Sequence, residues 1–348
     1  MISGLALLIL GAEILVRAAV RLAASLKVRP LIIGLSIVAF GSSAPQMTVS
    51  LQATLAGNTD IAVGSVIGSS IFNILVTLGL SALIIPLRVS RQLVRLDIPV
   101  MICAGLLVFT LAGNEELTPF DGLVLLVALV AYVALLHYQT RHSRRPRTLH
   151  TVASAPWLSS VLLMLGGFLV LVLAGHLLLG AAVDVASDLG LSERIIGLTL
   201  IGVGTSLPCL ATSLIAALRG EREIAVGNVI GSSLFNLLGV LGLTALLAPS
   251  PLSVSPNALD FDLPVMLGVV VLCLPVFYSG YRVTRAEGLL FLGLYLAYGL
   301  HVVSFTFGMP LATKLEQLML HYVLPALVAF LLFTSLRAWR RQHKRESQ

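Results

Sequence analysis

The sequence has little charge, little cysteine and no long polar stretch. Charged residues make up 11% of its 348 residues and hydrophobic residues 57%, whereas about a quarter of a soluble domain is charged. Apolar runs recur along the whole length, and each is long enough to cross roughly 30 Å of hydrocarbon. This composition excludes an ordinary soluble domain and predicts an all-α integral membrane protein in the lipid bilayer.

The chain also lacks the residue patterns of several other classes of protein. Its three cysteines, Cys103, Cys209 and Cys273, lie far apart in apolar segments and form neither a metal-binding cluster nor a disulfide framework. There is no nucleophile–base pair and no nucleotide-binding loop, so we expect neither an enzyme nor a bound cofactor. The net charge of +6 comes from short basic loops, which indicates membrane orientation and not nucleic-acid binding.

The positions of the basic residues predict the topology. Apolar runs between charged, Pro, Gly or Asn breaks give eleven membrane-spanning segments. If the N-terminus is outside, all 22 Lys and Arg residues except Arg194 and Lys314 fall in inner loops or in the C-terminal tail. Acidic residues such as Glu115 and Glu116 fall on the other side. Because cytoplasmic loops carry an excess of Lys and Arg, we expect the N-terminus outside and the C-terminus in the cytoplasm.

An internal repeat divides the chain. Residues 32–80 align without a gap with residues 195–243, at an offset of 163, and 27 of the 49 positions are identical. Each half holds five spans, and because five is odd the second copy is inverted in the membrane, an arrangement typical of secondary transporters. We therefore expect a first repeat at 1–138, a basic cytoplasmic linker at 139–157, a second, inverted repeat at 158–305, and an extra transmembrane helix with a basic tail at 306–348.

The best-matched residues of the repeat are polar. Spans two and seven carry Gly-Ser/Thr-Ser-x-Pro, and spans three and eight carry Gly-Ser-Ser-x-Phe-Asn. Pro45 and Pro208 each remove a backbone hydrogen bond, which predicts broken backbone lining a cavity. Since hard cations such as Na⁺ and Ca²⁺ prefer oxygen ligands, these segments predict a central cation site. Its ten candidate residues are Ser42, Ser43, Gln46, Ser69, Asn73, Thr205, Ser206, Cys209, Ser232 and Asn236.

The paired motifs resemble the alpha repeats of the calcium/cation antiporter superfamily, the sodium/calcium exchangers and their prokaryotic relatives. The resemblance covers residues 1–305. It implies ten core helices, a prokaryotic inner membrane, and exchange of Ca²⁺ against Na⁺ or H⁺ by alternating access. The family pattern Gly-Thr-Ser-x-Pro-Glu falls on Gly41–Gln46 and Gly204–Cys209, and Gly-Ser-Asn-x-x-Asn/Asp falls on Gly68–Asn73 and Gly231–Asn236.

The sequence departs from this family where the charge should be. The two central glutamates of the family fall on Gln46 and Cys209, and none of the four lining segments contains a carboxylate. A divalent ion stripped of water in a low-dielectric site needs compensating negative charge, and Ca²⁺ affinity follows the number of charged ligands. We therefore expect a secondary-active cation antiporter with altered or weakened Ca²⁺ selectivity. The transported ions would be Na⁺ and, less readily, Ca²⁺ or another cation.

Several residues leave alternatives open. Cys209 could ligate a softer metal as a thiolate, or serve as a small neutral hydrophobe beside Pro208. Glu13 is an acid within the first span and so a functional candidate, although Arg17 four residues later predicts a local ion pair. His176, at the equivalent position of the second repeat, could relay protons or form a hydrogen bond within the bundle.

Two further functions are compatible with the same residues. One is a non-transporting or regulatory membrane protein descended from an exchanger, and the other is a transporter of a different solute through the same cavity.

Three aspartates at predicted span ends, Asp97, Asp260 and Asp262, are expected to cap helices.

Overall fold

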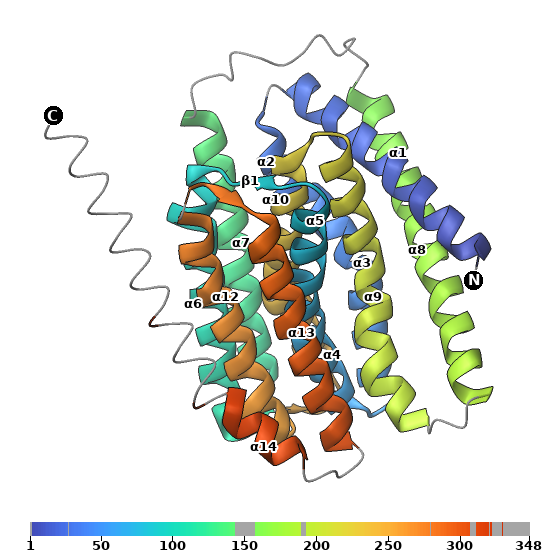
Figure 1. Cartoon of the computed structure of the whole chain (residues 1–348), viewed down its shortest axis with the longest axis vertical. Helices are drawn as coiled ribbons and strands as arrows, with labels where there is room; N and C mark the ends of the chain where they lie inside the picture. The colour runs from blue at the N-terminus through green and yellow to red at the C-terminus, as the bar shows by residue number, and fades with distance from the viewer. Residues whose placement is uncertain are drawn as a thin grey trace, which may run out of the picture.

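The structure is a computed structural model that describes residues 2–26, 28–142, 157–188, 193–278, 280–306, 311–319, 321 and 329. Its helices run side by side as a bundle (Figure 1). Eight helices of the described part are long and apolar enough to cross a membrane, and two others, α1 and α9, have 25 and 26 residues. Most of the predicted eleventh span, the C-terminal tail and most of the linker 139–157 lie outside the described residues.

The helices of the two halves follow each other along the chain. In the first half they are α1 Ile2–Leu26, α2 Pro30–Ile33, α3 Ala39–Leu55, α4 Thr59–Phe72, α5 Gly79–Ile84, α6 Ile98–Leu111 and α7 Pro119–His142. In the second half they are α8 Trp157–Asp188, α9 Glu193–Leu218, α10 Arg222–Leu234, α11 Leu241–Leu247, α12 Leu263–Tyr278, α13 Arg285–Thr306 and α14 Leu311–Leu318. The helices α3, α4, α9 and α10 hold most of the buried polar residues, and α1 packs chiefly against α8 beside them (Figure 1).

Irregular backbone occurs beside the asparagines and not at the prolines. The predicted break at Pro45 and Pro208 is wrong, because α3 and α9 continue through both residues. One lost backbone bond does not end a long helix whose two ends are held by packing. Instead, π-helical segments begin at Asn73 and just before Asn236, over Asn73–Leu78 and Phe235–Val240. Such segments are often found at functional sites.

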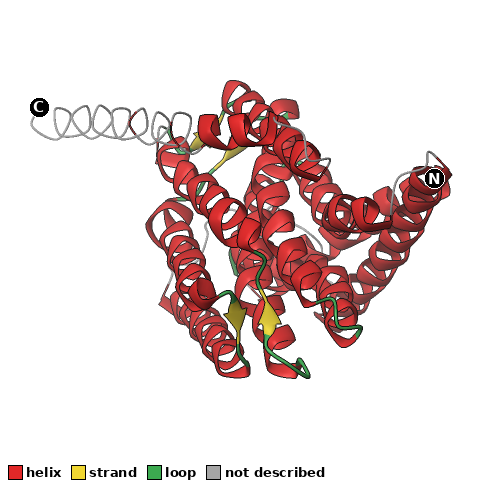
Figure 2. Cartoon of the chain, turned by 90° about the horizontal axis from the view of Figure 1, so that it is seen from below, coloured by secondary structure: helices red, strands yellow, loops and turns green. Residues whose placement is uncertain are grey.

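Four two-residue strands tie the halves together at the ends of the bundle (Figure 2). Strand β1 (Leu87–Arg88) pairs antiparallel with β4 (Arg282–Val283), and β2 (Glu116–Leu117) pairs with β3 (Leu252–Ser253). Because α6 runs between β1 and β2, the two pairs lie at opposite ends, which we name the β1–β4 face and the β2–β3 face. The strands at matching places in the repeats, β1 and β3, thus lie at opposite ends, as inverted repeats require.

Glycines allow α10 to pack closely on the second span. A Cβ placed on Gly227 would lie 2.9 Å from the Leu31 carbonyl oxygen, and one placed on Gly231 would lie 2.6 Å from the Leu35 carbonyl oxygen and 2.6 Å from the Ala39 Cβ. Small residues at a helix crossing permit this approach in membranes, where packing and hydrogen bonds hold helices together. The contact sets the distance between the two halves next to their buried polar residues.

We predict that Gly231→Ala destabilises the fold by about 1–3 kcal/mol, the usual cost of overpacking a dense interior. The added methyl group would meet the backbone of Leu35, which cannot move without shifting a helix. Thermal unfolding of the purified protein in detergent measures the effect. The matched control is Gly166→Ala in α8, where the added Cβ has open space. Equal unfolding temperatures for the two variants would contradict the prediction.

Candidate functional site

The central helices present their polar side chains in steps of four residues, the spacing that places side chains on one face of a helix. All of these side chains are buried. They are Ser42, Gln46 and Ser50; Ser65, Ser69 and Asn73; Thr205, Cys209 and Ser213; and Asn228, Ser232 and Asn236. The structure thus gathers the predicted site residues in the bundle interior, together with Ser43 and Ser206, which are also buried.

Gln46 is the hub of the first half. Its Nε2 donates hydrogen bonds to Ser50 Oγ and to Ser65 Oγ, each at 2.9 Å. Its Oε1 accepts a hydrogen bond of 2.5 Å from Thr205 Oγ1. The amide therefore joins α3 to α4 of its own half and to α9 of the other half.

Asn228 is the corresponding hub of the second half. Its Nδ2 donates to Ser213 Oγ at 2.9 Å and to the carbonyl oxygen and Sγ of Cys209 at 3.3 and 3.4 Å. Its Oδ1 accepts from Ser42 Oγ at 2.9 Å and from Ser232 Oγ at 3.4 Å. Asn228 is not among the ten residues predicted from the sequence, and neither are Ser50, Ser65 and Ser213. The four-residue spacing from Ser232 was the signal that could have found it.

Two oxygen clusters result. The Gln46 cluster contains Gln46 Oε1, Thr205 Oγ1 and the Gly202 carbonyl oxygen, which lies 3.2 Å from Thr205 Oγ1. The Asn228 cluster contains Asn228 Oδ1, Ser42 Oγ, Ser232 Oγ and the Ala39 carbonyl oxygen. In it, Ser42 Oγ lies 2.7 Å from Ser232 Oγ and 3.1 Å from the Ala39 oxygen. Both clusters offer only neutral oxygen atoms, the ligand type of hard cations.

Two buried amide oxygens on the same helix faces have no hydrogen-bond donor. Asn73 Oδ1 and Asn236 Oδ1 have no partner in the described part of the chain, and both residues are 2% exposed. The Nδ2 of Asn236 donates to Ser69 Oγ at 2.7 Å, which fixes the amide across the two halves. Leaving a buried acceptor unpaired costs about 1–3 kcal/mol, and a bound cation would remove that cost.

The carboxylates of the membrane-spanning helices lie outside the two oxygen clusters. No group of three His, Cys, Asp or Glu in the described residues could hold a metal ion. The prediction that Asp97 and Asp262 cap helices is wrong: they accept hydrogen bonds from Tyr132 Oη at 3.1 Å and Tyr298 Oη at 3.0 Å. A π-helical turn precedes each helix and already pairs its first N–H groups. Asp260 is exposed in the first turn of its segment.

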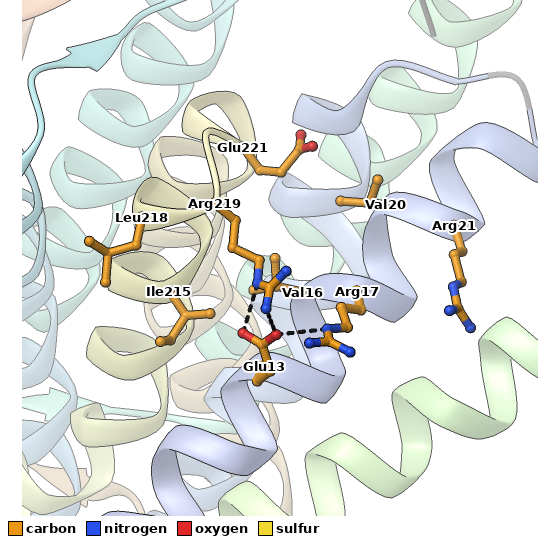
Figure 3. Close-up of a pocket in the computed structure, with 9 residues that line it drawn as sticks. All are labelled: Glu13, Val16, Arg17, Val20, Arg21, Ile215, Leu218, Arg219 and Glu221. Atoms are coloured by element: carbon orange, nitrogen blue, oxygen red, sulfur yellow. Dashed lines mark hydrogen bonds and ion pairs between the residues drawn. The ribbon is translucent and has the colours of Figure 1, made fainter. Parts of the chain in front are cut away.

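Glu13 is neutralised by arginines at the β1–β4 end of the bundle (Figure 3). The predicted pair with Arg17 is confirmed, with Arg17 Nε 2.7 Å from Glu13 Oε1. Arg219, at the end of α9, also binds the carboxylate, with Nε 2.8 Å from Oε2. These residues line a cavity of about 620 Å³ between α1 and α9. His176 is exposed on α8, so neither role predicted for it inside the bundle is supported.

Comparison with known proteins agrees with this architecture. The family model described as sodium/calcium exchanger protein matches residues 1–138 and 159–304. The chain is 38% identical to the putative antiporter CaxA of Alkalimonas amylolytica, over 85% of this chain and 95% of that protein. It is 36% identical to the inner membrane protein YrbG of Escherichia coli, over 78% and 86% of the two chains.

An archaeal relative and a solved structure extend the comparison. The chain is 30% identical to the sodium/calcium exchanger MaX1 of Methanosarcina acetivorans, over 85% of this chain and 95% of that protein. It superposes with a TM-score of 0.73 on the sodium-calcium exchanger NCX_Mj, at 30% identity, over 84% of this chain and 94% of the other. These matches span both halves and support cation antiport by a multi-pass membrane protein. The chain belongs to the sodium/calcium exchanger family.

Proposed function

We propose that this chain is a secondary-active antiporter that carries Na⁺ through the central oxygen site and has a weakened affinity for Ca²⁺. The observation that carries the proposal is the buried pair of oxygen clusters, which is built only from amide, hydroxyl and backbone carbonyl groups. The two unpaired amide oxygens, on Asn73 and Asn236, give a cation further ligands.

Charge decides between the two ions. Removing a divalent ion from water into a low-dielectric interior costs far more than removing a monovalent ion. The cost is recovered only where negative charge compensates it, and affinity for Ca²⁺ rises with the number of charged ligands. Gln46 and Cys209 bring no formal charge to the site, and neither do the surrounding hydroxyls. A site of this composition favours a monovalent ion such as Na⁺, because it needs less compensating negative charge than Ca²⁺.

The buried state of the site supports alternating access. Gln46 is 1% exposed and Asn228 0% exposed, so neither oxygen cluster is open to solvent from either face. On one side, a Cβ placed on Gly41 would overlap the ring of Phe168 from α8. Ion entry then requires the helices around the site to move, and inverted halves allow the same movement toward either face.

The basic residues of the structure support the proposed orientation. Arg88 and Arg282 lie in the strands of the β1–β4 face, and Arg219 and Arg222 lie beside the turn at Gly220 between α9 and α10. Because Lys and Arg accumulate in cytoplasmic loops, we place the β1–β4 face in the cytoplasm. The start of α1 then lies outside, and eleven spans place the C-terminus inside, in a prokaryotic inner membrane.

Flux through the purified protein tests the proposal. We expect protein reconstituted in vesicles to exchange internal ²²Na⁺ for external unlabelled Na⁺, with little ⁴⁵Ca²⁺ uptake under an outward Na⁺ gradient. Protein-free vesicles give the background. Robust Na⁺-driven ⁴⁵Ca²⁺ uptake would contradict the loss of Ca²⁺ affinity. Absence of ²²Na⁺ exchange would contradict transport of Na⁺, and would favour a regulatory protein or a different solute.

Two adjacent serines give a matched pair of variants. Ser232→Ala removes an oxygen of the Asn228 cluster, whereas Ser233→Ala removes a hydroxyl that bonds only one turn back, to the Val229 carbonyl at 3.0 Å. Losing one neutral ligand costs about 1 kcal/mol, or roughly fivefold in affinity. We expect the Na⁺ concentration for half-maximal exchange to rise about fivefold in the first variant and to stay unchanged in the second. Equal effects would remove Ser232 from the site.

Adding charge should restore binding of Ca²⁺. Gln46→Glu places a carboxylate of nearly the same shape in the Gln46 cluster, and we expect Ca²⁺ binding about tenfold tighter than in the wild type, because a charged ligand contributes about 1.5 kcal/mol or more. Calorimetric titration with CaCl₂ measures the gain. Gln52→Glu, an exposed position on the same helix, is the control. A gain no larger than in this control would count against the assignment of the site.

A further inference from the structure

The two halves carry their central amide on different helices. At the first of two equivalent positions, Gln46 of α3 corresponds to Cys209 of α9. At the second, Ser65 of α4 corresponds to Asn228 of α10. The first half thus has a long amide beside a small hydroxyl, and the second half has a small thiol beside a long amide. Each half keeps one amide and one small residue, in exchanged places.

The exchanged amides make the same contacts. Gln46 donates to Ser50 and Asn228 donates to Ser213, and these serines are equivalent at the offset of 163. The carbonyl oxygen of Gln46 meets the hydroxyl of Thr205, and that of Asn228 meets the hydroxyl of Ser42, again an equivalent pair. The position of the amide oxygen relative to the other half is therefore kept, although the helix that supplies it has changed.

We propose that Asn228 Oδ1 is the second-half ligand of the transported monovalent cation, in the role that sequence comparison gives to the side chain at position 209. The inference rests on the proposed function, since it names a ligand of that same site. The cation binds between Asn228 Oδ1, Ser42 Oγ and Ser232 Oγ. Gln46 Oε1 provides the equivalent oxygen in the first half.

The hydrogen bonds of Asn228 fix which of its atoms faces the ion. Its Nδ2 points to the Cys209 carbonyl oxygen, which can only accept, so the amide cannot turn over without losing that bond. Its Oδ1 is consequently directed at Ser42 and Ser232. The side chain is fully buried, which leaves the oxygen no water as an alternative partner.

The thiol of Cys209 is a weaker candidate for the same ion. Its sulfur accepts a hydrogen bond from Asn228 Nδ2 at 3.4 Å, and it lies near the hydroxyls of Ser42, Ser213 and Ser232. A neutral thiol is a soft ligand, and Na⁺ and Ca²⁺ prefer oxygen. Between a thiol and an amide oxygen in one cluster, a hard cation selects the amide oxygen.

The cluster can exchange its hydrogen bonds for an ion without leaving a proton unpaired. In the structure, Ser42 and Ser232 donate toward Asn228 Oδ1. Both hydroxyls also have the Ala39 carbonyl oxygen within reach, at 3.1 and 3.4 Å. That oxygen already accepts the backbone N–H of Ser43 within α3, and its second lone pair can accept Ser42. Ser232 can in turn donate to Ser42 Oγ at 2.7 Å. Their own lone pairs and Asn228 Oδ1 then face the cation.

Replacing an amide by a carboxylate of the same shape tests the assignment of Asn228 as a ligand. The test measures ion binding and does not require transport. The variant Gln46→Glu/Asn228→Asp places one carboxylate in the Gln46 cluster and one in the Asn228 cluster. Its control, Gln46→Glu/Asn58→Asp, makes the same second change at an exposed asparagine. Calorimetric titration of both purified proteins with CaCl₂ is expected to give at least tenfold tighter binding for the Asn228 variant. A difference of less than threefold would overturn the proposal.

A rescue series covers the case in which two carboxylates prevent folding. Asn228→Ser removes the amide, and Asn228→Ser/Cys209→Gln restores it in the arrangement of the first half. The measurement is thermal stabilisation by Na⁺ in detergent. We expect the Na⁺ concentration for half-maximal stabilisation to rise at least fivefold in the single variant and to return within twofold of wild type in the double variant. Unchanged stabilisation in the single variant, or failure of a folded double variant to recover, would overturn the assignment.

These measurements separate the ligand from the transport activity. A tenfold gain in Ca²⁺ binding together with no ²²Na⁺ exchange by wild-type vesicles would support Asn228 as a ligand and refute Na⁺ transport. Active ²²Na⁺ exchange together with no gain from Asn228→Asp would leave the antiporter in place and refute the ligand. Ser233→Ala serves as the folding and handling control in both series, because its hydroxyl bonds only within α10.

Discussion

Polar groups at the depth of a membrane have no water to bind, and this constraint governs the centre of the molecule. Serine, threonine and amide side chains recur every four residues on α3, α4, α9 and α10, and the bundle satisfies them by crossing these helices face to face. The hydrogen bonds of Gln46 and Asn228 run between the halves. The close approach of α10 at Gly231 keeps the helices near enough for those bonds to form.

The inverted repeat explains both the symmetry of the network and its exception. Equivalent strands pair crosswise at the two ends, and equivalent asparagines, Asn73 and Asn236, lie at the two π-helical segments. The exception is the position of the central amide. The amide can come from α3 in one half and from α10 in the other because the two positions touch within each half. Gln46 of α3 contacts Ser65 of α4, and Asn228 of α10 contacts Cys209 of α9. The network therefore requires one amide and one small residue at the two neighbouring positions of each half, and it constrains less which position carries the amide.

Charge is kept away from this centre. Glu13 binds Arg17 and Arg219 at the β1–β4 end, and Asp97 and Asp262 are held by tyrosines of α7 and α13. The oxygen clusters consequently stay neutral. Under the proposed function, within a family whose relatives include a sodium/calcium exchanger, a neutral candidate site offers a divalent ion less charge compensation.

The sequence alone determined the class, the repeat and most of the candidate site. Hydropathy reports the spans because every residue of a span meets the same apolar solvent. The gap-free repeat identified the ten buried residues and the family motif. All of these are properties of single segments or of their comparison along the chain, so no knowledge of the three-dimensional contacts was needed to find them.

The tertiary structure decided which groups meet. It brought Asn228 among the candidate site residues, gave Glu13 a second arginine from the end of α9, and turned Asp97 and Asp262 from expected caps into tyrosine partners. It also showed α3 and α9 continuing through their prolines. Each of these outcomes depends on how distant helices cross and which faces they bury. That geometry is set by the packing of segments between 35 and 206 residues apart, which a local pattern does not encode.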